Sequence, residues 1–520
     1  MLKNVSVPFS IKNISFATFI LLLGAALSFF WSMYFERAIL ATPYEIGYRE
    51  GAPQVITQML IDRDNFSTFE YQPLGYNAYG VSYNFAVLPF ALIFGNTLHI
   101  HRWVTFIFIL LSTATGFWVV FQQRRSFALA LICSAFIMIA FMGWGGVGSA
   151  PSTMGTFLFL AAIFIPYLRS FDNTGIILSA VLAVIAFHTK AYFVLSFGIV
   201  AAYLFLFISK KKAIGYGVIF LMLFAAAFAV IRINYPLYFV NTIRGNASNT
   251  FRTFKHLYTQ LFWLTVYFLP ILGLTGLMLW KIPGSKQKAM EKTRIKFDLW
   301  NLNNPFFDLR PDFFLHTFII SLLAFLIVLG SHVGNYLAYS YELVVPTFLF
   351  WFFINFDQKR TFTILPAFAI VINLFYWQYI TLNPQMLTQR SSVEWKKAFS
   401  YLDPSLNILN SPTLTSRMIE LGMTPVDSGQ TDVYYLMDPY PDNSLIGPSY
   451  QEYYNDGVAY TNSINESIAK QEYDLIIITK DVDVFYDLEL IKENYEMVDQ
   501  LILYMSATEQ KWVVQIWEPK

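Results

Sequence analysis

The sequence predicts a polytopic α-helical membrane protein with a small α/β domain at its C-terminal end. Of its 520 residues, 56% are hydrophobic and only 13% are charged, whereas soluble proteins carry roughly 25% charged residues. Apolar runs close to 20 residues long recur along the first part of the chain, and a helix of about this length crosses a bilayer. From about Leu382 onwards the composition is that of a soluble domain.

The charge and the cysteine content exclude several classes of protein. A formal net charge of +1 gives no reason to expect nucleic acid as a partner. The single cysteine, Cys133, lies inside an apolar run, so we expect neither a disulfide framework nor a cysteine metal site. The first apolar segment, 16–35, can span a bilayer and lacks a small-residue cleavage site, so we expect it to remain as an anchor.

The positions of lysine and arginine predict the orientation, because they concentrate in cytoplasmic loops. Lys3 and Lys12 precede the first span and place the N-terminus in the cytoplasm. Basic clusters such as Arg124-Arg125 and Lys210–Lys212 then fall on the same side. We therefore expect a multi-pass protein of the inner or plasma membrane, with an extracytoplasmic C-terminal domain.

The predicted spans follow from the lengths of the apolar runs. The run 85–94 has about ten residues, which is short for a span, so we expect an interfacial helix there. About eleven transmembrane helices result. They lie near 16–35, 103–121, 126–144, 154–168, 174–188, 191–209, 213–233, 259–280, 314–331, 340–356 and 361–380.

The chain divides into a transmembrane module, 1–381, and an α/β domain, 382–520. In the second part, 392–402 and 413–421 have helical spacing, whereas 474–479 and 511–517 have the pattern of buried strands. Helices that alternate with strands in about 130 residues predict a small α/β domain.

The segment 37–96 lies between the first two full-length apolar runs and is too polar to cross a bilayer. Loops longer than about 12–15 residues are usually functional or disordered. Its many aromatic and apolar residues argue against disorder. We interpret it as an ordered active-site loop on the membrane surface.

Two carboxylates of this loop are candidates for acid–base chemistry. Glu50 follows shortly after the first span and could accept the proton of an acceptor hydroxyl. The alternative, a solvated partner of Arg49, is the more frequent case for a lone glutamate. Glu70 lies among aromatic residues, where burial and a nearby cation would shift its pKa; a hydrogen-bonded structural acid is the alternative.

Cations at the predicted outer ends of the helices are candidates for phosphate binding. His101-Arg102 and Lys190 adjoin apolar runs, and ionisable residues at membrane depth usually face the bundle interior or a pathway. A lipid-linked phosphate suits such cations, although snorkelling to the interface is the alternative for Lys190. Glu342 could line the same cavity or end a helix. The histidines lack metalloprotease spacing, but a divalent cation bound by carboxylates stays open.

Four features in order make this chain resemble the GT-C class of membrane glycosyltransferases, in particular protein O-mannosyltransferases and the lipid A aminoarabinose transferase. An acidic motif, 48–51, follows the first span, and a Phe-Glu-x-x-Pro-Leu run, 69–74, comes next. An interfacial helix then precedes Arg102, and a Thr-Lys pair containing Lys190 opens a later outer turn. The resemblance covers roughly the first 210 residues.

The resemblance implies transfer of a sugar from a polyprenyl-phosphate donor to an extracytoplasmic acceptor with inversion. Glu50 would be the catalytic acid of the first loop and Glu70 the acid near the donor phosphate. Because Arg49 stands where many relatives have an aspartate, the base is either Glu50 or Glu45. The expected residues around the substrates are Arg102, Lys190 and His101 at the donor phosphate, and Arg49, Tyr71, Tyr76, Tyr79 and Glu342 as further contacts.

The sequence thus predicts a glycosyltransferase that uses a lipid-phosphate sugar and a glycan, lipid or protein acceptor in the bilayer. No glycine-rich phosphate loop for a nucleotide sugar occurs in the cytoplasmic segments. A transporter or flippase is one alternative, but its polar residues would lie near the bilayer midplane on broken helices. An O-antigen ligase or polymerase is the other, and we would expect its large outer loop late in the chain.

Overall fold

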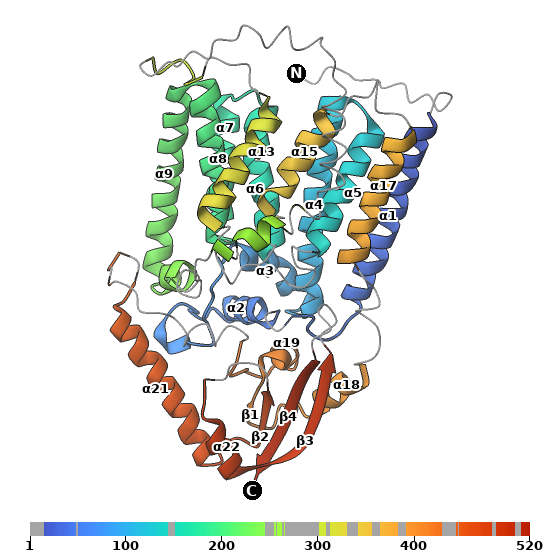
Figure 1. The fold of residues 1–520 in the computed structure, drawn as a ribbon. Coiled ribbons are helices and arrows are strands. Elements are labelled where there is room, and N and C mark those ends of the chain that lie inside the picture. Colours follow the sequence, from blue (N-terminus) through green and yellow to red (C-terminus); the bar gives the residue numbers. More distant parts are fainter. Residues whose placement is uncertain are drawn as a thin grey trace.

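The computed structural model has a bundle of long helices and, at one end of it, a small β-sheet flanked by helices (Figure 1). It describes residues 15–47, 50–143, 151–244, 254–255, 257–262, 265, 301–307, 312–329, 342–355, 364–382, 392–428, 442, 444–445, 447–480, 485–504 and 511–520. Helix α1 (Phe16–Leu40) begins at the end of the bundle opposite the sheet and ends close to the sheet.

The bundle helices form where the sequence is continuously apolar. Among the described residues, six helices are long and apolar enough to cross a membrane, and shorter apolar helices lie between them. Besides α1, the bundle contains α4 (Leu98–Arg124), α5 (Phe127–Gly143), α6 (Pro151–Leu168), α7 (Asn173–Phe187), α8 (Leu195–Tyr203), α9 (Lys210–Asn234), α13 (Phe313–Ala324), α15 (Val345–Asn355) and α17 (Ile364–Thr381).

These helices lie within or overlap the predicted spans, although α8, α13 and α15 each cover only part of theirs, and two further differences stand out. The span predicted at 259–280 lies largely outside the described residues. Helix α4 begins at Leu98, earlier than the predicted 103, because Thr97 caps it and its side chain accepts the N–H of Ile100. His101 and Arg102 therefore belong to the first turns of α4.

Small residues let neighbouring helices approach closely. Helix α1 packs against α17 and α5, and a Cβ atom at Gly24 would lie 2.6 Å from a methyl carbon of Val371. Glycine is therefore required at this crossing, as is common where membrane helices pack together.

The segment between α1 and α4 is folded across the end of the bundle nearest the sheet (Figure 1). It contains α2 (Gly51–Asp62), a short 3₁₀ turn η2 (Phe69–Tyr71) and α3 (Ser82–Phe94). The helix predicted over 85–94 is confirmed as α3, whose Leu92 and Ile93 are exposed. The segment is thus ordered, with α2 as an element that the sequence reading did not predict.

The C-terminal part contains a mixed four-stranded sheet of order β1-β2-β4-β3. Strands β1 and β2 are parallel, whereas β2 with β4 and β4 with β3 are antiparallel. The elements are α18 (Ser392–Ser400), β1 (Ile408–Leu409), η8 (Pro412–Leu414), α19 (Thr415–Glu420), α21 (Tyr450–Ala469), β2 (Leu475–Thr479), α22 (Leu488–Asn494), β3 (Tyr495–Tyr504) and β4 (Lys511–Pro519). The two predicted helices and two predicted strands coincide with α18, α19, β2 and β4.

The contact of Gly24 with α17 leads to a test of the bundle packing. Gly24→Leu is expected to lower the thermal unfolding midpoint in detergent, because forcing extra carbon atoms into a packed interface costs about 1–3 kcal/mol. Gly198→Leu in α8 is the control, since no atom lies within 4 Å of a Cβ there. Equal midpoints for the two variants would contradict this packing.

Candidate functional site

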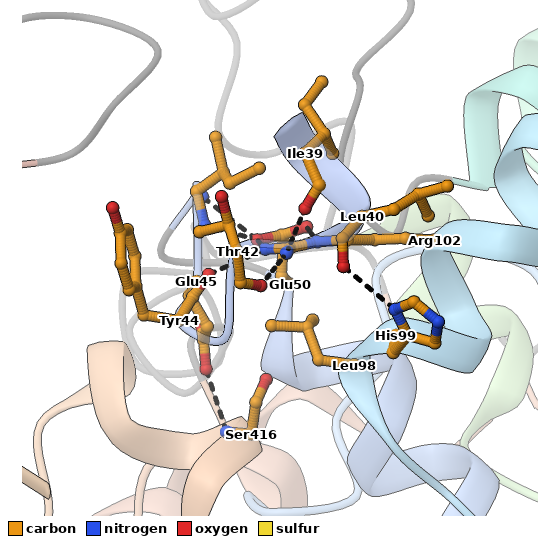
Figure 2. Close-up of polar contacts among 12 residues, drawn as sticks. Ile39, Leu40, Thr42, Tyr44, Glu45, Glu50, Leu98, His99, Arg102 and Ser416 are labelled. Atoms are coloured by element: carbon orange, nitrogen blue, oxygen red, sulfur yellow. Dashed lines mark hydrogen bonds and ion pairs between the residues drawn. The ribbon is translucent and has the colours of Figure 1, made fainter. Parts of the chain in front are cut away.

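An ion pair between Glu50 and Arg102 lies where α1, α2 and α4 meet (Figure 2). Arg102 is completely buried, and Glu50 is 5% exposed. Arg102 Nε donates to Glu50 Oε1 over 3.1 Å, and Nη2 donates to Oε2 over 2.8 Å. This two-point geometry matches the planar guanidinium to the carboxylate.

The remaining N–H groups of Arg102 bind the last turn of α1 and the chain that follows it. Nη1 donates to the carbonyl oxygens of Ile39 and Thr42 over 3.0 and 2.6 Å, and Nη2 donates to that of Tyr44 over 2.8 Å. A guanidinium has five N–H donors, so all are engaged. In this structure the donors of Arg102 are thus occupied by protein groups, and its binding of a donor phosphate stays a prediction.

The carboxylate of Glu50 is likewise surrounded by hydrogen-bond donors. Besides the two bonds from Arg102, its Oε2 accepts the backbone N–H of Ile46 and, at 3.4 Å, that of Gly47. A carboxylate enclosed by donors has no oxygen directed at a substrate hydroxyl. The prediction of Glu50 as a free general base is therefore not supported by its contacts, and the residue instead holds the turn before α2 in place.

Glu45, the alternative base, lies beside this pair and contacts the C-terminal part. Its Oε1 accepts the backbone N–H of Ser416 over 2.8 Å (Figure 2). Burial raises the pKa of Glu45 to about 8, while the Ser416 bond and the charge of Arg102 lower it and Glu50 raises it. Within the part of the chain that the structure describes, the buried Oε2 has no hydrogen-bond partner.

The loop around Glu45 is held against the C-terminal part from several sides. The ring of Tyr44 stacks on Trp395 of α18, with ring centroids 4.8 Å apart and an interplanar angle of 4°. At the start of α4, the backbone N–H of Leu98 donates to Glu420 over 3.2 Å. A groove of about 690 Å³ opens along this junction, lined among others by Tyr44, His99, Trp395, Arg417 and Glu420.

A second polar cluster lies between α7 and α8 and contains three predicted residues. Lys190 Nζ donates to the hydroxyl of Ser152 at the start of α6 and lies 4.7 Å from the centroid of the Tyr79 ring. The carboxylate of Glu342 is buried, accepts a hydrogen bond from Tyr192 and interacts electrostatically with Lys190. The structure therefore brings Lys190, Tyr79 and Glu342 together.

Backbone hydrogen bonds hold the segment carrying Tyr79 beside the segment carrying Lys190. The N–H of Gly80 donates to the carbonyl of Thr189, and that of Ser82 donates to the carbonyl of His188, each over 2.9 Å. A Cβ atom at Gly80 would lie 1.8 Å from the His188 oxygen, so only glycine fits there.

The other predicted contacts have different surroundings. Glu70 is exposed, which corrects the expectation that aromatic residues enclose it, because the short turn η2 points its side chain to solvent. Tyr71 donates to Asp64 over 3.1 Å. Tyr76 packs in a small core with Leu237 and Tyr453 instead of facing a cavity.

His101 and Arg49 complete the predicted set. His101 is fully buried, and its Nε2 lies 3.0 Å from Asn96 Oδ1, so its position in α4 contradicts a role at an open phosphate site. Arg49 lies outside the described residues. Among the described ranges, no group of three or more histidine, cysteine or acidic side chains is arranged to bind a metal.

Two residues near Arg102 and Glu45 were not predicted from the sequence as part of the site. Glu36, in the last turns of α1, is buried and interacts electrostatically with Arg102. In the sequence, Glu36 could have been noticed as an acid at the end of an apolar span, where placing a charge costs free energy. Ser416 acts through its backbone N–H, which no residue pattern reveals.

The buried ion pair leads to a prediction about stability. Glu50→Gln is expected to destabilise the protein by about 3–5 kcal/mol, because it leaves the Arg102 guanidinium buried without a counter-charge. The measurement is the unfolding midpoint of the purified variant. Glu70→Gln, at an exposed position of the same loop, should leave the midpoint unchanged, and similar midpoints for both variants would refute the structural role of the pair.

Comparison with known proteins gives a match at the level of structure. No family model matches the chain, and no curated protein matches it. The solved structure of ArnT from Cupriavidus metallidurans bound to undecaprenyl phosphate matches with a TM-score of 0.56 and 12% identity, covering 96% of this chain and 98% of that one. The apo state of the same protein gives 0.58 and 11%, with the same coverage.

An oligosaccharyltransferase from Archaeoglobus fulgidus matches more loosely, with a TM-score of 0.48, 11% identity and coverage of 93% of this chain and 73% of that one. The two ArnT structures match 96% of this chain, so the likeness extends over the bundle and the C-terminal part alike. The fold of this chain is that of the GT-C class of membrane glycosyltransferases.

Proposed function

We propose that this protein transfers a sugar from a polyprenyl-phosphate carrier to an acceptor at the end of the bundle that carries the 41–96 segment, with inversion at the sugar carbon. The observation that carries the proposal is the cluster of Lys190, Tyr79, Ser152 and Glu342 at that end. The fold supports it, because ArnT shares this fold and has been solved with undecaprenyl phosphate.

Lys190 is the proposed ligand of the donor phosphate. An ammonium group has three N–H donors, and Ser152 accepts one of them. The buried carboxylate of Glu342 and the face of the Tyr79 ring favour the charged amine. A fixed cation beside the leaving phosphate stabilises the negative charge that develops as the sugar departs.

Glu45 is the proposed general base. Glu50 is enclosed by donors, whereas Glu45 accepts one backbone N–H and its raised pKa of about 8 lies near a physiological operating pH. In the proposed step, the acceptor oxygen bonds to the sugar carbon and its proton passes to Glu45. The bond from that carbon to the phosphate oxygen breaks, and the lipid phosphate leaves with the electron pair.

The flippase and transporter alternative has less support. It calls for polar groups near the bilayer midplane on interrupted helices. The polar clusters described above lie at the ends of helices, around the start of α4 and α6 and after α7. The nature of the acceptor, whether glycan, lipid or protein, is left to experiment.

The first test concerns the donor. Purified protein incubated with undecaprenyl-phosphate sugars and membrane extracts should release undecaprenyl phosphate, measured by mass spectrometry. Lys190→Gln should weaken binding of undecaprenyl phosphate by roughly tenfold or more, since it removes a charge-assisted hydrogen bond. Lys396→Gln, an exposed cation on α18, is the control. Unchanged affinity for Lys190→Gln would remove this residue from the donor site.

The second test concerns the base. Glu45→Gln keeps the shape of the side chain but removes the proton acceptor, and should reduce turnover by about 10²–10⁴-fold. Because a base acts when ionised, wild-type turnover should rise with pH, be half-maximal near pH 8 and level off about one pH unit higher. Glu70→Gln serves as the control. Near-normal turnover in Glu45→Gln would exclude this assignment and leave the donor site intact.

A further inference from the structure

Helix α19 of the C-terminal part lies directly against the proposed base. The N–H of Ser416, in the first turn of α19, points at Glu45 Oε1. At the start of α2, a Cβ atom on Gly51 would lie 2.7 Å from Thr415 Cβ. This approach brings the beginning of α2 and α19 into contact, so Glu45 is enclosed by two parts of the chain that are far apart in sequence.

Hydrogen bonds to the sheet fix the position of α19. The Thr415 hydroxyl donates to the carbonyl of Asp427, and Asn410 Nδ2 donates to the same oxygen over 3.0 Å. Asn410 follows β1, and its Oδ1 accepts the N–H groups of Val426 and Asp427. Next to it, Ser411 shares a hydrogen bond with Thr479 at the end of β2. The N–H of Ser416 is therefore held in place by hydrogen bonds to the segments that follow β1 and precede residue 428, in addition to the packing of α19 against α2.

We propose that Ser416 is a positioning residue of the active centre, whose backbone N–H orients Glu45 and favours its ionised form. The proposal rests on the proposed function, in which Glu45 is the general base. It extends the active centre into the C-terminal part, which supplies the backbone N–H of Ser416 and, more weakly, the side chain of the same residue. A first-turn N–H of a helix lacks an intrahelical acceptor, so it is free for such a contact.

The charged groups around Glu45 shift its pKa in opposite directions. Burial favours the neutral acid, as does the charge of Glu50 in the same loop, while Arg102 of α4 favours the carboxylate. On α19, Arg417 and Glu420 pair with each other over 3.2 Å. Arg102 is already engaged by Glu50 and three carbonyls, so the donors next to the Glu45 carboxylate come from Ser416, whose backbone N–H lies 2.8 Å from Oε1 and has the larger effect, while its side chain has a smaller one.

The experiment removes this donor with Ser416→Pro, because proline is tolerated in the first turn of a helix, where its missing N–H breaks no helical bond. The pH at which turnover is half-maximal should move up by about one unit. Turnover should then fall about tenfold at pH 7 and recover at pH 9. Gln451→Pro, at the same second position of α21, is the matched control and should keep the wild-type profile.

A readout without turnover separates this inference from the proposed function. Because the pKa of Glu45 is raised in the folded protein, the folded state binds more protons between pH 4.5 and about 8, and thermal stability should fall as pH rises through this window. In Ser416→Pro the fall should continue above pH 8, and in Glu45→Gln it should be smaller than in the wild type, because the buried Glu36 keeps its own part of the slope. These shifts support the positioning role even if no sugar transfer is found.

Other outcomes would overturn the inference. A loss of turnover that is equal at all pH values, with an unchanged stability profile, would make Ser416 merely structural. If Ser416→Pro does not fold, Thr415→Val replaces it, because loss of the hydroxyl bonded to Asp427 loosens α19. It should shift both profiles in the same direction by a smaller amount, and unshifted profiles would refute the role of α19.

Discussion

The way α1, α2 and α4 meet, at the end of the bundle nearest the sheet, depends on one buried guanidinium. Arg102 binds Glu50 at two points and three carbonyls, one in the last turn of α1 and two just after it, so it joins the end of α1, the start of α2 and α4. A charge in such a place is tolerated only when fully paired. This requirement fixes residues 41–47 and Glu50, and thereby decides which carboxylate is engaged and which, Glu45, remains beside it.

The cluster around Arg102 and the cluster around Lys190 differ in how many N–H donors of the cation are already used by protein partners. Around Arg102 every donor is matched, which suits a structural role. Around Lys190 the amine is held by one hydroxyl, an aromatic face and a carboxylate, an arrangement that keeps a cation in position while leaving it able to bind an anion. The proposed transfer from a lipid phosphate needs both a rigid frame and a cation with N–H donors left for the phosphate.

The fold was largely predictable because bilayer thickness sets the length of apolar runs, and α3, α18, α19, β2 and β4 follow from local patterns. Helix α21 and strand β3 were not predicted, because their exposed positions give weak periodicity. The site was only partly predictable. The partner of Glu50 lies 52 residues away, and backbone donors such as the N–H of Ser416 leave no trace in residue types. Side-chain chemistry suggested both Lys190 and Arg102 as phosphate ligands, but could not tell that the N–H groups of Arg102 are already bound.

The fit of Gly80 against the His188 carbonyl has a consequence for engineering and for divergence among relatives. Two backbone bonds join the strand-like stretch carrying Tyr79 to the turn carrying Lys190, and no side chain fits between them. The two stretches therefore constitute a single exchangeable module. A chimaera that imports one stretch without the other would misplace the amine relative to the ring, whereas a joint transplant would preserve their spacing.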